Sequence, residues 1–169
     1  MTTDKAILNW QSFSIGADEV VRFVQPSINS IALNRVTGVD PSVILGSLQA
    51  NGRIFLLNPN GILFGAGAQI DVGGLLATTL QIRDEDFMAG RYFFAQDQLK
   101  GLKSVVNQGT IHVSDHGFVV LAAPGVSNEG MIVANLGTTV LASGKTVTVD
   151  LMGDGLINYA ISGKVLDQV

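Results

Sequence analysis

The feature that most constrains this chain is a repeat of short apolar runs separated by corner residues. Asn107 and Asn128 open equivalent corners 21 residues apart, and Gly117 and Gly137 lie 20 residues apart. The runs between the corners are rich in β-branched and aromatic residues and are too short to be stable helices. A repeat of this length, built from strands and corners alone, predicts an all-β chain folded as a parallel β-helix. Each coil would bury its inner face by stacking on its neighbours.

The pattern is densest in residues 51–80, where Asn58-Pro59-Asn60-Gly61 separates two apolar runs. Asparagine and glycine tolerate positive φ, and Pro59 fixes its own φ while pushing Asn58 towards an extended conformation. The tetrapeptide therefore predicts a rigid corner. Corner asparagines of a β-helix can bind backbone groups of the adjacent coil that would otherwise be unpaired. A structural role is expected for Asn58, Asn60 and Gly61, with direct contact to a partner protein as the alternative.

The run at residues 54–57 is apolar at every position, although only alternate residues of a strand can face the interior. The candidate outward pair is Phe55 and Leu57. Either another element covers this strip, for which residues 81–104 or the amino-terminal strands are candidates, or it faces a partner protein. Residues 118–123 have the same property.

Residues 81–104 break the repeat and predict an excursion outside the β-helix. Asp84 is expected to cap a short turn that ends at Gly90, and residues 91–95 have the composition of a strand. Residues 146–169 alternate in polarity and are expected to close the chain without a clear cap.

The corner at Asp40-Pro41 leaves the next residues ambiguous. Asp40 can cap a short helical turn with Pro41 at its first position, so residues 43–48 fit either a strand or a helix. If every coil were regular, 169 residues would form about eight coils and a rod roughly 40 Å long. The irregular segments would shorten this rod.

Composition narrows the function classes. The chain is 47% hydrophobic and 14% charged, with a net charge of −4, and its sequence has no basic cluster for nucleic acid or an anionic membrane surface. It contains no cysteine, which excludes disulfides and thiolate metal sites. No apolar run is long enough to span a membrane as a helix, and residues 1–5 lack the apolar core of a signal peptide.

Two groups of side chains contain residue types that are common in metal and catalytic sites. His112 and His116 flank Asp115, but residues four apart on a strand lie about 13 Å apart, so no metal or cofactor is expected. Asp71 and residues 84–86 supply clustered carboxylates, which some β-helix proteins use to cleave polysaccharides. That chemistry needs two carboxylates facing one groove, and three consecutive acids on a turn cannot all face one site. The chain is therefore not expected to be an enzyme.

The strings SIALNRVTG, DPS and LQANGRIFLLNPNGILFGAGAQIDVGGLLATT follow one another between residues 30 and 79. In this order they resemble the haemagglutination-activity, or two-partner secretion, domain of filamentous haemagglutinin-type exoproteins. The resemblance runs from about Ala6 to the carboxyl terminus. It implies a right-handed parallel β-helix, with residues 1–169 as one domain at the amino end of a much longer adhesin, haemolysin or contact-dependent toxin.

The resemblance also implies a function and a partner. The domain would be a non-catalytic secretion-targeting and folding-nucleating module, read by the periplasmic repeats of an outer-membrane transporter. The exoprotein would be secreted to the surface of a Gram-negative-type bacterium. The family motif comprises Asn58, Pro59, Asn60, Gly61 and Ile62, which are the candidate recognition residues; the secondary motif comprises Asn34, Arg35 and Val36.

The chain departs from the family pattern in two places. An upstream Asn-Pro-Asn-Leu motif has no match, and Val24-Gln25-Pro26-Ser27 stands in that region. Only nine residues precede Trp10, where relatives usually carry a strand-rich cap. Because an uncapped β-helix exposes unpaired strand edges, end-to-end self-association is expected unless residues 1–8 fold over that end.

The alternative function is a carbohydrate-binding or polysaccharide-degrading β-helix. A sugar groove would be lined by exposed aromatic side chains, and Trp10, Tyr92 and Tyr159 are too scattered in the sequence to indicate one. Host or bacterial glycans remain possible ligands of the full-length protein.

Overall fold

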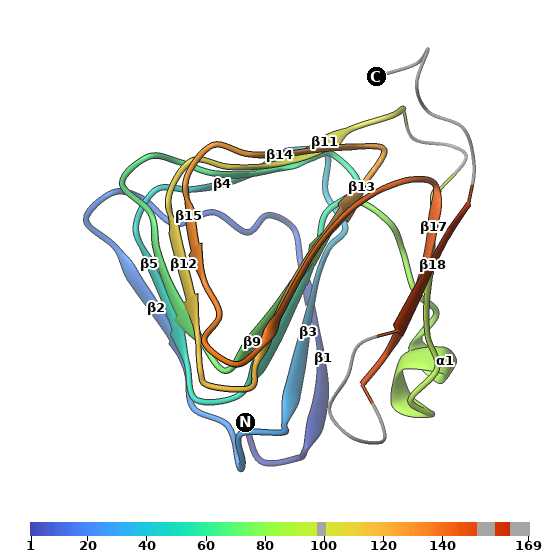
Figure 1. Cartoon of the computed structure of the whole chain (residues 1–169), viewed down its shortest axis with the longest axis horizontal. Helices are drawn as coiled ribbons and strands as arrows, with labels where there is room; N and C mark the ends of the chain where they lie inside the picture. Colours follow the sequence, from blue (N-terminus) through green and yellow to red (C-terminus); the bar gives the residue numbers. More distant parts are fainter. Residues whose placement is uncertain (98–100, 152–157, 163–169) are drawn as a thin grey trace.

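The computed structural model describes residues 1–97 and 101–151, together with the backbone of residues 158–162. Three parallel sheets form the three sides of a coil that is roughly triangular in cross-section (Figure 1). The predicted parallel β-helix is confirmed. Within the described residues the regular structure is almost entirely strand, apart from the short helix α1 (Asp84–Met88).

Each side of the coil is one sheet with in-register parallel pairing. Sheet A contains, in spatial order, β1 (Lys5–Trp10), β3 (Ile31–Val36), β6 (Arg53–Leu57), β9 (Gly74–Thr78), β13 (Phe118–Ala123) and β16 (Thr138–Ser143). Sheet B contains β4 (Ser42–Ile44), β7 (Ile62–Phe64), β11 (Ser104–Asn107) and β14 (Gly125–Asn128). Sheet C contains β2 (Val20–Phe23), β5 (Ser47–Ala50), β8 (Gln69–Val72), β12 (Thr110–Val113) and β15 (Met131–Val133).

The coils stack with the register that the repeat predicts. Asn107 lies opposite Asn128 in sheet B, and Gly137 sits against the Gly117 carbonyl one coil away. Among the described residues sheet A nevertheless has six strands rather than about eight, because the segments that contain α1, β10 (Tyr92–Ala95) and β17 (Thr146–Asp150) lie outside the coil.

The interior of the coil holds one apolar core, built from alternate residues of all three sheets. In β6, Ile54 and Leu56 point inward, and in β13 Val119 and Leu121 do so. All four are fully buried. Layers of branched and aromatic side chains stacked in this way bury the inner face of every coil that has neighbours on both sides.

A second core lies on the outer face of sheet A. There the excursion supplies α1 and β10 (Tyr92–Ala95), and β10 forms an antiparallel sheet D with β17 (Thr146–Asp150) and β18 (Asn158–Ser162). In Figure 1, α1, β17 and β18 lie outside the side of the coil that sheet A forms. The predicted excursion is confirmed. Residues 146–150, part of the stretch expected to close the chain without a clear cap, form β17, which pairs antiparallel with β10 instead of adding another coil.

The structure resolves one open alternative and corrects one local expectation. Residues 43–48 contain the end of β4 and the beginning of β5 and no helical turn, and Ile44 and Leu48 fill the interior. Asp84 is the first residue of α1 rather than its cap. The cap position is Arg83, which makes no side-chain cap hydrogen bond. Gly90 ends the turn with φ +79°, as expected of glycine after a helix. None of the helices in the described residues could cross a membrane.

The two ends of the coil differ from its middle. At the amino-terminal end, Met1, Thr2 and Thr3 lie with Ala6 and Leu8 around a hollow of about 330 Å³. At the other end, alternation along β16 directs Leu141 inward, yet this side chain is 47% exposed. Within the described chain, no further coil stacks on β16.

Candidate functional site

The Asn58-Pro59-Asn60-Gly61 corner joins β6 of sheet A to β7 of sheet B. Gly61 adopts φ +116°, which a residue with a side chain rarely adopts. Asn58 is fully buried, and its Nδ2 donates to the carbonyl of Asp40 (3.0 Å) and to the hydroxyl of Ser42 (2.9 Å). Both acceptors belong to the preceding coil. The side chain of Asn58 therefore ties the two coils together at the corner.

Asn60 adds a second tie beside the first. Its backbone N–H and its Nδ2 both donate to Asn58 Oδ1, at 2.9 and 3.0 Å. The same Nδ2 also donates to the carbonyl of Gly38 at 2.9 Å. These contacts satisfy carbonyl groups that the turn from sheet A to sheet B leaves outside any strand ladder.

The family motif offers little surface in the folded domain. Asn58, Pro59, Gly61 and Ile62 are buried, and Asn60 is half-buried. The contacts are those expected of a structural corner, and a protein that binds the folded domain at this motif would reach mainly Asn60.

The secondary motif is divided between the two cores. Asn34 points into the coil, where it accepts a hydrogen bond from the indole N–H of Trp10 at 3.0 Å. Its Nδ2 lies within reach of the carbonyls of Ala32 (3.3 Å) and Phe55 (3.4 Å). This pairing gives a fully buried amide its partners. Val36 is also buried in the interior.

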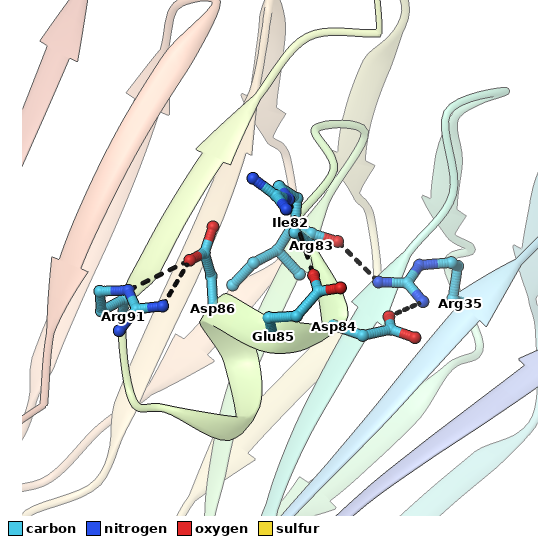
Figure 2. Close-up of polar contacts among 7 residues, drawn as sticks. All are labelled: Arg35, Ile82, Arg83, Asp84, Glu85, Asp86 and Arg91. Atoms are coloured by element: carbon cyan, nitrogen blue, oxygen red, sulfur yellow. Dashed lines mark hydrogen bonds and ion pairs between the residues drawn. The ribbon is translucent and has the colours of Figure 1, made fainter.

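Arg35 points the other way and holds the excursion. Its Nη1 lies 2.6 Å from Asp84 Oδ1, and its Nη2 donates to the carbonyl of Ile82 at 2.7 Å (Figure 2). The Arg35 side chain is 15% exposed and that of Asp84 is 56% exposed. Charge-assisted hydrogen bonds of this length are stronger than neutral ones, so the guanidinium anchors the start of α1 to β3.

Lys5 holds the other end of α1. Its ammonium donates to the carbonyl of Phe87 at 3.1 Å and lies 3.4 Å from that of Met88. The same ammonium sits 5.6 Å from the ring centroid of Phe87 and 5.2 Å from that of Tyr92. A cation at the carbonyl end of a helix and over aromatic faces is favourable on both counts.

Phe55 occupies the middle of the second core. Its ring centroid lies 5.9 Å from Phe87, 5.7 Å from Tyr92, 6.2 Å from Phe94 and 6.5 Å from Phe118. Leu57 is buried in the same cluster. Of the two alternatives for the strip of Phe55 and Leu57, the structure shows the covered one, and the excursion supplies the cover together with β17.

Arg53, the first residue of β6, is the third cation on this face. It lies 5.7 Å from the ring centroid of Phe118, and its Nη2 donates to Asn29 Oδ1 at 3.2 Å. Burial lowers the pKa of the Arg53 guanidinium below its ordinary value, and nearby Tyr92 acts in the opposite direction.

The carboxylates of residues 84–86 do not converge on a groove. Asp84 pairs with Arg35, Glu85 lies 3.6 Å from Arg83, and Asp86 pairs with Arg91 at 3.1 Å. Figure 2 shows the three carboxylates pointing towards three different arginines. This arrangement does not offer the facing carboxylate pair that glycosidic bond cleavage requires.

The other candidate groups are also dispersed. His112 Nδ1 lies 3.1 Å from Asp71 Oδ1 on the outer face of sheet C, and His116 occupies a corner with φ +64°. Among the described residues no three histidines or carboxylates are grouped as metal ligands. Trp10 packs edge-on against Phe13, and Tyr92 is buried in the second core, so these aromatics do not line a common groove.

Sequence reasoning missed two residues of this architecture. Gln25 is buried where the upstream asparagine motif of the family has no match, and its side chain donates to the carbonyls of Ser30 and Arg53 and accepts from the Gly52 N–H. The neighbouring Pro26 is the signal that could have identified Gln25 as a corner amide. Lys5 had no comparable signal, because its partners lie more than 80 residues away in the chain.

A family model described as the TPS secretion domain matches residues 2–165. The chain belongs to the TPS secretion domain family. The predicted resemblance to two-partner secretion proteins is thereby confirmed. Exoproteins of this family are secreted by Gram-negative bacteria through an outer-membrane transporter.

Relatives from Haemophilus influenzae agree with this assignment. The crystal structure of the HMW1 secretion domain superposes with a TM-score of 0.89 at 40% identity, covering 96% of this chain and 43% of that one. The heme/hemopexin-binding protein of strain Rd is 40% identical over 96% of this chain, and a second protein of that name is 44% identical over 56%. This chain spans 18% and 10% of the lengths of these two proteins.

Proposed function

We propose that this TPS domain is a non-catalytic module that targets a long exoprotein for secretion and nucleates its folding outside the cell. The exposed Leu141 at the end of the coil is the observation that carries the nucleation part. Leu141 lies in register with Leu121, which is buried in the interior of the coil, yet Leu141 is 47% exposed. A following coil that stacked on β16 would cover it and extend the core.

The edges of the last coil support the same role. β14, β15 and β16 each pair with an earlier strand on one side only within the described chain. A parallel edge with a partly exposed apolar interior is a template on which another coil can stack without an energy source. The relatives that extend far beyond the aligned region are consistent with a longer parent protein.

We propose that the transporter reads this domain before it folds. The family motif at residues 58–62 is mostly buried in the folded domain, so its side chains are available to periplasmic repeats chiefly in the unfolded chain. A chain that crosses the periplasm unfolded would present Asn58 and Asn60, and these residues would become corner braces after export. The absence of cysteine suits such a crossing, because no disulfide can trap a folded intermediate.

The test is an export assay with the 169-residue chain behind a signal peptide, produced with and without its cognate outer-membrane transporter. We expect the chain in the medium only when the transporter is present. Purified periplasmic repeats of the transporter should bind the chain freshly diluted from urea and bind the folded domain weakly. Export that is independent of the transporter would contradict the proposal.

A second part of the proposal concerns the amino-terminal end. β1 and β2 are the first strands of sheets A and C, and within the described chain each pairs on one side only. Met1, Thr2 and Thr3 line the hollow at this end without forming a strand across it. We propose that this edge allows end-to-end association of the isolated domain. Light scattering over a wide concentration range tests this, and a monomer at the highest concentration would reject it.

A further inference from the structure

The outer face of the first coils depends on segments that come much later in the chain. Ile31 and Leu33 of β3, with Phe55 and Leu57 of β6, have almost no exposed surface. Their cover consists of side chains from α1, β10 and β17, namely Phe87, Tyr92, Phe94, Val147 and Val149. Without this cover a continuous apolar strip, including a phenylalanine, would face water, which is unfavourable for each coil that carries it.

The cover is itself assembled from two distant segments. β10 is held on sheet A through antiparallel pairing with β17, in which Phe94 lies opposite Val147 and Tyr92 lies opposite Val149. All four of these side chains are buried in the second core. A single short strand without its partner would be only marginally stable. We therefore expect β10 to pack stably on sheet A only after β17 has paired with it.

Polar anchors connect the same cover to the first two strands of sheet A. Arg35 of β3 binds Asp84 and the carbonyl of Ile82 at the beginning of α1. Lys5 of β1 binds the carbonyl of Phe87 at its end. The strand that begins the coil is thus joined directly to a helix by a contact between residues 82 positions apart in the chain.

We propose that α1, β10 and β17 act as a strap that closes over sheet A and makes the amino-terminal coils part of one cooperative unit with residues near 150. The coils before β9 are then not an independent seed, although their stacking is local in sequence. If the domain is exported as proposed above, the first coils to emerge complete their folding only after the strap has emerged. The last coil, whose edge at β16 is the template for further coils, therefore forms at nearly the same time as the coils that precede it.

Native-state hydrogen exchange on the full chain tests the strap, with two variants of adjacent residues in β10. Phe94→Ala removes a buried ring that packs on Phe55, whereas Phe93→Ala removes a 48% exposed ring from the opposite face of the same strand. We expect Phe94→Ala to reduce the protection factors of amides in β3 and β6 as much as those in β10 and β17, by about 100-fold or more. Phe93→Ala should change them less than about threefold.

The opposite pattern would overturn the proposal. If Phe94→Ala lowers protection in β10 and β17 while β3 and β6 keep theirs, the amino-terminal coils are an independent unit. Should Phe94→Ala fail to fold, the wild-type chain in increasing sub-denaturing urea gives the same answer. The free energies of exchange for amides of β3, β6, β10 and β17 should then converge on one opening reaction. One reaction for β3 and β6 and a different one for β10 and β17 would refute the strap. Because these measurements use no transporter, their failure would leave the secretion proposal untouched.

Discussion

The corner at Asn58 gives the sharpest test of how the coils are held together. Asn58→Ala would remove a side chain that donates to the Asp40 carbonyl and the Ser42 hydroxyl and accepts from two N–H groups of Asn60. The Asn58 side chain makes no hydrogen bond within the strand ladders of β6 and β7. The substitution therefore removes contacts between and within the corners and leaves the strand pairing in place.

The size of the effect follows from those contacts. Each hydrogen bond contributes about 1 kcal/mol net, and a buried partner left unsatisfied costs about 1–3 kcal/mol. The loss at Asp40 is reduced, because Asn60 Nδ2 also lies 3.4 Å from the Asp40 carbonyl, and water can reach half-buried Asn60. We therefore expect Asn58→Ala to lower the free energy of unfolding by about 3 kcal/mol, which corresponds to roughly 6–12 °C in Tm for a domain of this size.

Urea unfolding with two probes measures this change. The single tryptophan, Trp10, reports the first coil, and far-UV circular dichroism reports all the sheets. Asn60→Ala should cost less, about 1–2 kcal/mol, since Asn60 is half-buried. The same substitution at an exposed asparagine, Asn9→Ala, serves as the control and should change the free energy of unfolding by less than about 0.5 kcal/mol.

Two results would refute the reasoning. If Asn58→Ala leaves the unfolding midpoint within the range of the Asn9→Ala control, the corner contacts do not hold the coils together. If stability is unchanged while export in the assay above is lost, the motif acts through direct contact with the transporter instead.

Further predictions address the anchor, the route of export and the stacking of corners. Arg35→Gln should lower the free energy of unfolding by about 1–2 kcal/mol in urea titration, since its partner Asp84 is more than half exposed and solvent screens the pair; an unchanged midpoint would show that the anchor is not stabilising. Cysteines introduced at Phe93 and Thr148, positions that pair in sheet D of the folded domain, should be joined by oxidation of the unfolded chain in the periplasm; the disulfide should stop export until a reductant is added, whereas single cysteines should not. Export of the crosslinked form would refute an unfolded crossing. Gly117→Ala would place a methyl group 2.3 Å from a carbonyl of the preceding coil and should cost about 1–3 kcal/mol by thermal unfolding, while Gly101→Ala, whose nearest neighbour is 4.0 Å away, should be neutral. Equal effects at the two glycines would contradict the stacking argument.

Local chemistry accounts for what the sequence predicted correctly. The 20- to 21-residue spacing of corners set the register, and the structure pairs Asn107 with Asn128 as that spacing requires. Alternation along β6 required one apolar pair to face outward, and the break in the repeat at residues 81–104 was one of the two candidates for covering it. These conclusions depend on turn preferences and on the two-residue period of a strand, which act over a few positions.

Local chemistry was insufficient where the deciding contact is distant in the chain. Residues 43–48 fit strand or helix on their own, and only the interior they fill made them strands. Residues 146–150 alternate as any solenoid strand would, so the sequence did not distinguish another coil from a strand that pairs with β10.

The sequence by itself determined that this chain stacks in parallel coils and which family it belongs to. Both conclusions depend on motifs that either repeat along the chain or comprise only a few neighbouring residues. The tertiary structure alone decided that Lys5 and Arg35 fasten a helix from the excursion and that β17 closes over Phe55. The physical reason is that hydrophobic burial is non-directional and independent of sequence distance. An apolar strip shows that it needs a cover, and only the assembled fold shows which segment provides it.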